Sequence, residues 1–227
     1  MGLIQLVWME IKVFRRTDVI ANDKKRMKQT IVFLFIAFFI PKVEAKKMVY
    51  PIEVMAGNAV LIVVGEIDTV KGNLYTFNIS ETLKGNLYYS ISVEMFEEWE
   101  CDKRFAKPEK GQKLCLFLKK GLTNWEIING STGELVISNS IITLGGYEEY
   151  KHIAYKFTPY KLSLEEFKNG IKEFCKCFIF IGEYSFRDEK AFFRQVVADK
   201  QISEFKNISI FSSWLWEKMS KHHVEKT

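Results

Sequence analysis

Short apolar runs, some alternating with polar residues and some continuous, fill the chain between Val60 and Ile142 and are separated by turns rich in glycine and asparagine. The runs cover residues 59–67, 75–80, 89–95, 114–118, 125–127 and 135–137. Turn residues separate them at Lys71-Gly72-Asn73, Lys84-Gly85-Asn86, Lys110-Gly111 and Asn129-Gly130. A period of two is typical of half-buried strands, so this part of the sequence predicts an antiparallel β-sandwich or barrel.

The period changes after Ser163. Apolar residues then recur at helical spacing, at Leu164, Phe167, Ile171 and Phe174, and Ser163 with Glu166 forms a capping-box start. Two more helices are predicted over residues 188–205 and 208–219. The expected fold class is therefore α+β, with a barrel domain over residues 46–145 and a helical region over residues 146–227. The aromatic residues of the last helix are expected in a core, with a partner or membrane contact as the alternative.

The first 45 residues have the three parts of a secretion signal. Lys24-Lys25-Arg26 and Lys28 precede an uninterrupted apolar run, Ile31–Ile40, and Val43-Glu44-Ala45 supplies the small residues of a cleavage site. We expect cleavage between Ala45 and Lys46, and export to a periplasmic or extracellular space. A buried segment of a cytosolic protein and a retained membrane anchor are the alternatives. Met27 would open a compact signal directly, so translation is predicted to start there.

Most of the positive charge lies in this leader. The chain carries a formal net charge of +5, and residues 1–45 contribute eight basic and four acidic residues. The remaining 25 basic and 24 acidic residues nearly cancel. The body therefore gives no electrostatic reason to expect a nucleic-acid partner.

Several segments of the barrel region resemble netrin-like domains, the barrels found in tissue inhibitors of metalloproteinases and in related bacterial exported proteins. The segments are Val64-Gly65-Glu66, Leu83-Lys84-Gly85, Cys101–Phe105 and Gly111–Leu118, within residues 58–138. The resemblance implies a five-stranded OB-type barrel. Those inhibitors chelate the protease zinc through a Cys-x-Cys at the mature N-terminus, whereas the start expected here is Lys46-Lys47-Met48. Inhibition by that mechanism is not expected.

No catalytic, cofactor-binding or metal-binding residue set is predicted. His152 stands alone, His222-His223 is interpreted as a solvated pair in a polar tail, and no phosphate-loop or metalloprotease spacing occurs. Acidic residues cluster around Trp99, at Glu97, Glu98, Glu100 and Asp102. A charged loop is the favoured interpretation of this cluster. A calcium site, or a dispersed enzyme site over Glu97–Asp102 with Arg104, is the alternative.

The four cysteines, Cys101, Cys115, Cys175 and Cys177, all follow the leader. A disulfide between Cys101 and Cys115 is the candidate bond, because both flank the turn at residues 107–111 and an exported protein meets an oxidising compartment. An inert core thiol at Cys115 is the alternative.

The leading functional hypothesis is an exported, non-catalytic binding or interaction protein whose partner is a protein or envelope ligand. The alternatives are an envelope enzyme with the acidic site just described, and an envelope protein anchored by its uncleaved leader. Membrane contact is expected only in that last case.

Overall fold

The computed structural model describes residues 47–144 and 161–226. All of them belong to one compact unit, Lys46–Thr227. The predicted leader and its cleavage site at Ala45 and Lys46 lie outside the described residues, as does His152. Within the described ranges, no helix is long and apolar enough to cross a membrane.

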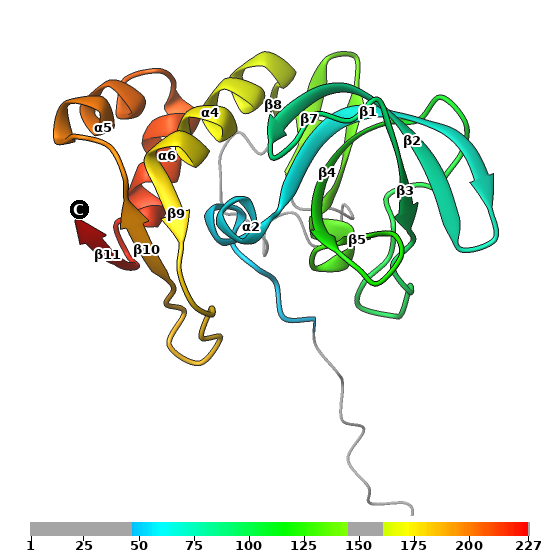
Figure 1. Ribbon diagram of the computed structural model, residues 1–227, viewed down its shortest axis with the longest axis horizontal. Helices are drawn as coiled ribbons and strands as arrows, with labels where there is room; N and C mark the ends of the chain where they lie inside the picture. The colour runs from blue at the N-terminus through cyan, green and yellow to red at the C-terminus, as the bar shows by residue number, and fades with distance from the viewer. Residues whose placement is uncertain (1–46, 145–160, 227) are drawn as a thin grey trace, which may run out of the picture. The chain divides into compact units, whose positions relative to one another are not determined.

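Five strands curl into a closed barrel (Figure 1). They are β1 (Leu61–Lys71), β2 (Leu74–Lys84), β3 (Ser90–Glu94), β4 (Lys113–Lys120) and β5 (Trp125–Ile127). Their order is β1-β2-β3-β5-β4, and the antiparallel pairing of β4 with β1 closes the barrel. This topology is compatible with an OB-like fold. The prediction of a wholly antiparallel barrel was wrong in one respect, because β3 and β5 pair in parallel, with Val93 opposite Trp125.

Three further strands extend the sheet from β4. A 3-10 turn, η1 (Gly130–Thr132), leads into β6 (Glu134–Ser138), which pairs with β4, and β7 (Ile141–Thr143) and β8 (Lys161–Ser163) follow in order. The predicted turn at Lys84-Gly85-Asn86 requires its glycine. Gly85 has a φ of +95°, and a Cβ there would lie 2.5 Å from the carbonyl oxygen of Val60.

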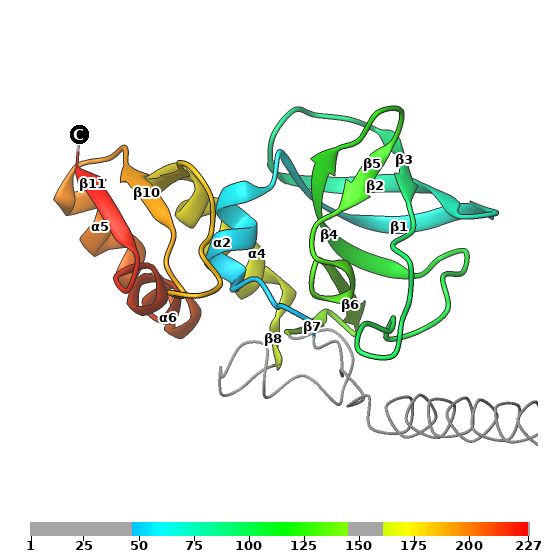
Figure 2. The same ribbon diagram turned by 90° about the horizontal axis from the view of Figure 1, so that it is seen from below.

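The C-terminal region contains helices and a second sheet. Its elements are α4 (Leu164–Cys177), β9 (Phe178–Phe180), β10 (Phe192–Gln195), α5 (Asp199–Lys206), α6 (Ile210–Met219) and β11 (His223–Lys226). The three strands form a sheet in the order β11-β10-β9, as labelled in Figure 1, and Figure 2 shows β11 beside β10 from below. The structure confirms the helix predicted over residues 208–219. The helix predicted over residues 188–205 was wrong in its first half, because Phe192–Gln195 pairs with strands on both sides.

Helix α4 begins at the predicted residue, but only the Ser163 half of the predicted capping box forms. The hydroxyl of Ser163 accepts a hydrogen bond of 3.2 Å from the backbone N–H of Glu166. The Glu166 carboxylate does not return the bond to Ser163. It accepts instead from the backbone N–H of Phe211 at 3.3 Å, which ties the start of α4 to the start of α6.

Two hydrophobic cores meet along β1. Leu61 and Val63 point into the barrel, whereas their neighbours Ile62 and Val64 belong to a second core on the outer face. A strand covered on both faces has no polar alternation, which explains the continuous apolar run there.

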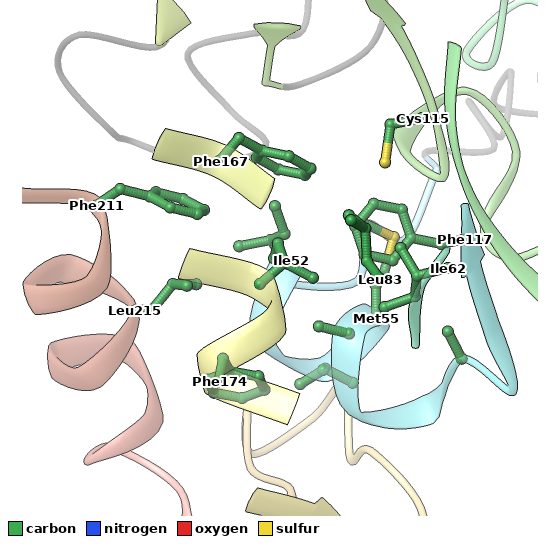
Figure 3. Packing of buried hydrophobic residues seen from close by; sticks show 14 of the residues in the cluster. Ile52, Met55, Ile62, Leu83, Cys115, Phe117, Phe167, Phe174, Phe211 and Leu215 are labelled. Carbon is green, nitrogen blue, oxygen red and sulfur yellow. The ribbon is translucent and has the colours of Figure 1, made fainter. Parts of the chain in front are cut away.

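The outer core joins the barrel to the C-terminal region. Side chains from the barrel strands meet those of α2 (Ile52–Asn58), α4 and α6 in it (Figure 3). For example, Phe117 of β4 and Phe167 of α4 lie edge to face with ring centroids 6.5 Å apart. The helices therefore cover one side of the barrel rather than forming a separate core.

Candidate functional site

A pocket of about 470 Å³ opens on the outer face of the barrel. Strands β1 and β2 contribute Val64–Glu66 and Asn78–Ser80, and Lys113, Ile137 and Leu164 complete the lining. The backbone N–H of Leu164 donates to the Ser140 carbonyl at 2.8 Å. This bond holds the first residue of α4 beside the sheet, where it forms one wall of the pocket.

One residue of the pocket lining, Gly65, lies at a position where the structure accepts only glycine. The pairing of β1 with β2 shifts register between Val64 and Gly65. A Cβ at Gly65 would lie 2.0 Å from the carbonyl oxygen of Asn78, too close for any side chain. The Ser80 hydroxyl donates to the Val64 carbonyl at 3.0 Å across the same irregularity. At Gly65 the two strands therefore lie closer together than any side chain would allow.

The pocket combines apolar walls with one acid and one base. Ile79, Ile137 and Leu164 supply apolar surface, and Glu66 lies opposite Lys113 in the register of β1 and β4. Both charged side chains are exposed. Such a lining can hold an apolar group while pairing with polar or charged groups at its edge.

An ion-pair cluster fixes α4 against β2 near this pocket. Glu81 of β2 accepts from Lys168 at 2.6 Å and also from Lys172, both on α4. Partial burial opposes the ionisation of Glu81, but the hydrogen bonds from the two lysines outweigh it and lower its pKa. The cluster therefore stabilises the helix in the position that forms the pocket.

The acidic residues around Trp99 do not converge. Trp99 and Asp102 close a tight turn with two backbone hydrogen bonds. The Asp102 carboxylate accepts from Lys47 at 2.7 Å and from the backbone N–H of Ser131 at 3.0 Å. The Glu98 carboxylate accepts instead from the backbone N–H of Arg104 at 2.5 Å. Within the described ranges, no three His, Cys, Asp or Glu side chains are grouped to hold a metal ion.

A buried ion pair that sequence reasoning missed links the same loop to β6. Arg104 Nε lies 3.1 Å from Glu134 Oε1, and both side chains are only 5% exposed. The Tyr75 hydroxyl donates to the other Glu134 oxygen at 3.2 Å, and the Arg104 guanidinium stacks 3.8 Å over the Phe96 ring. Burial raises the pKa of Glu134 to about 6, against the opposing attraction of Arg104. No local sequence signal marks this pair, because its two residues are 30 positions apart in a mixed polar and apolar stretch.

The four cysteines are free thiols in the structure. Cys115 is wholly buried on the outer face of β4, and burial raises its pKa well above the ordinary value. Burial also raises the pKa of Cys175 and of Cys177 to about 11. Thiols with such values are protonated at neutral pH and are poor nucleophiles. The disulfide between Cys101 and Cys115 stays a prediction.

The interpretation of His222 as a solvated tail residue was wrong. Its side chain is 4% exposed, and Nε2 lies 3.2 Å from Oε1 of the equally buried Glu53 on α2. Nδ1 accepts from the backbone N–H of Ala191 at 3.3 Å, so Nε2 carries the proton that bonds to Glu53. His223 is exposed and stacks on Phe192 at 4.8 Å. The pair His222–Glu53 thus joins the last strand to the first described helix.

The chain matches no family model, no curated protein and no solved structure.

Proposed function

We propose that this chain is an exported, non-catalytic binding protein that holds a protein or envelope ligand in the pocket over Gly65. The pocket is the observation that carries the proposal, because it is open, apolar-walled and edged by Glu66 and Lys113. A protein segment that inserts one apolar side chain, with polar or charged groups beside it, suits this lining. No nucleic-acid partner is proposed.

The resemblance to netrin-like domains supports the same proposal, because OB-type barrels bind ligands on their outer faces and loops. The proposed localisation, periplasmic or extracellular, depends on the leader and its cleavage between Ala45 and Lys46. An uncleaved leader would give an envelope protein with the same pocket.

The enzyme alternative draws less support from the geometry. Asp102 is held by Lys47 and Ser131, and Glu98 is held by the Arg104 backbone, so the two carboxylates serve different local contacts. A hydrolase screen of the purified protein tests it. Activity that Glu98→Gln abolishes would favour the enzyme.

A pair of tryptophan substitutions on β2 tests the pocket. Asn78→Trp places an indole in the lining, whereas Thr76→Trp places one on the same outward strand face, beyond the lining residues. Immobilised wild-type protein and Thr76→Trp should capture the same ligand from the envelope fraction, and Asn78→Trp should lose it. Equal capture by both variants, with unchanged thermal unfolding, would reject the pocket as the binding site.

A further inference from the structure

The barrel end at which β1 begins carries exposed apolar side chains on separate loops. The residue before β1 is Val60, the β2–β3 loop spans residues 85–89, and the β4–β5 loop spans residues 121–124. We call these three segments the loop end. It shares no residue with the pocket over Gly65.

Strand pairing brings the three segments together. Leu61 pairs with Leu118 near the end of β4, and Ile62 pairs with Lys84 at the end of β2. Both loops therefore leave the barrel beside the start of β1. The Tyr88 and Trp125 rings meet edge to face with centroids 5.8 Å apart, which links the two loops directly.

The apolar side chains of the loop end project fully into solvent. Leu87, Tyr89 and Leu122 are 88%, 97% and 103% exposed, respectively, and Val60 is more than half exposed. An interface with a folded protein is centred on side chains packed into pockets. Isolated apolar side chains on separate loops suit a lipid bilayer better, because lipid can surround each side chain without a preformed cavity.

Lysines beside the loop end favour an anionic surface. Lys119 and Lys120 directly precede the β4–β5 loop, and residues 85–89 and 121–124 contain no acidic residue. Lys84 is not counted, because it donates to the carbonyl oxygens of Ala56 and Gly57 at 2.9 and 2.6 Å. Lys119 pairs with Glu126 on β5 at 2.9 Å, whereas Lys120 lies over the Trp125 ring with its ammonium 5.6 Å from the centroid. Cations beside tyrosine and tryptophan are typical of groups that settle among lipid headgroups.

We infer that the loop end docks on an anionic lipid surface, with Leu87 and Leu122 entering the acyl boundary and Lys119 and Lys120 among the headgroups. This contact is independent of any anchoring by the leader and of the proposed ligand pocket. It would hold the exported protein at a membrane face reversibly.

Depth-dependent quenching tests the inference on the full chain. Leu122→Trp adds an indole at the loop end, and Ile210→Trp adds one at another exposed position, at the start of α6. Each variant is mixed with phosphatidylcholine vesicles brominated in the acyl chains and containing about one third phosphatidylglycerol. All variants carry the same leader, so binding by the leader is common to both. The quenching of each variant is compared with that of the wild-type protein, whose five tryptophans are common to both, so the difference reports on the added indole.

We expect the bromine atoms to quench the indole added at position 122 and to leave the one added at position 210 unquenched. Lys119→Gln with Lys120→Gln, or raised salt, should weaken the quenching at position 122. Equal quenching at the two positions would overturn the inference and favour a protein as the occupant of the loop end. Undiminished quenching after loss of both lysines would overturn the requirement for anionic lipid.

Discussion

Replacing Arg104 by methionine removes the cation from the buried pair with Glu134 while keeping much of the side-chain volume. In the wild-type protein the folded-state pKa of Glu134 is about 6, above the ordinary 4.5. Folding therefore favours the protonated carboxyl, and this contribution is full below about pH 4.5 and lost as the pH rises through 6. The difference in pKa corresponds to about 2 kcal/mol of disfavoured ionisation above that range.

Without Arg104, only the hydrogen bond from Tyr75 offsets the burial of the carboxylate, so the pKa of Glu134 should rise further. Near pH 7, Arg104→Met should lower the free energy of unfolding by about 3 kcal/mol, because it leaves an uncompensated buried charge. Near pH 5, Glu134 is neutral in the folded state, so the cost should fall to about 1 kcal/mol, mainly the lost bond to the Phe96 carbonyl. Adding Glu134→Gln should restore about 2 kcal/mol near pH 7.

Urea unfolding of the variants at the two pH values measures these differences. Arg194→Met is the matched control, because Arg194 pairs with Glu225 at the surface and both side chains are substantially exposed. Its cost should stay below about 1 kcal/mol. A cost for Arg104→Met that is the same at both pH values would refute the reasoning, since it would mean that the charge of Glu134 plays no part.

Three other predictions concern the core, the leader and the cysteines. Phe174 is fully buried among Phe178, Phe193 and Phe205, so Phe174→Ala should lower the free energy of unfolding by about 3–5 kcal/mol in urea, whereas Ala at the half-exposed Phe105 should cost far less. N-terminal sequencing of the exported protein should begin at Lys46, and an intact leader in the membrane pellet would contradict this. Non-reducing peptide mapping tests the candidate bond between Cys101 and Cys115, which would stabilise the fold by about 3 kcal/mol. Two alkylatable thiols after denaturation would exclude the bond.

The barrel was predictable because its signals are local. Period-two runs and glycine turns are properties of neighbouring residues, and they place all five barrel strands near their observed positions. The parallel pairing of β3 with β5 was not predictable in this way. This pairing depends on how β5 returns to the sheet after residues 95–124. The residues next to β5 in the sequence do not specify its direction relative to β3.

The misassigned segments depend on contacts between distant residues. Phe192–Gln195 has near-helical apolar spacing with the residues around it, but pairing with β9 and β11 overrides that local preference. His222 looked solvated because its sequence neighbours are polar, yet Glu53, 169 positions away, buries it. The pocket over Gly65 likewise lies beside a register shift, which a single sequence does not display.

The position of β1 between two cores has a consequence for biogenesis. Its side chains belong alternately to the barrel interior and to the outer core. Neither core can therefore lose its packing without exposing β1 to solvent. Unfolding should therefore be one cooperative transition over the described unit. In a nascent chain, Ile62, Val64 and Phe117 would also stay exposed to solvent until α4 and α6 had been synthesised and could cover them. During synthesis, that interval is when the chain most needs protection from self-association.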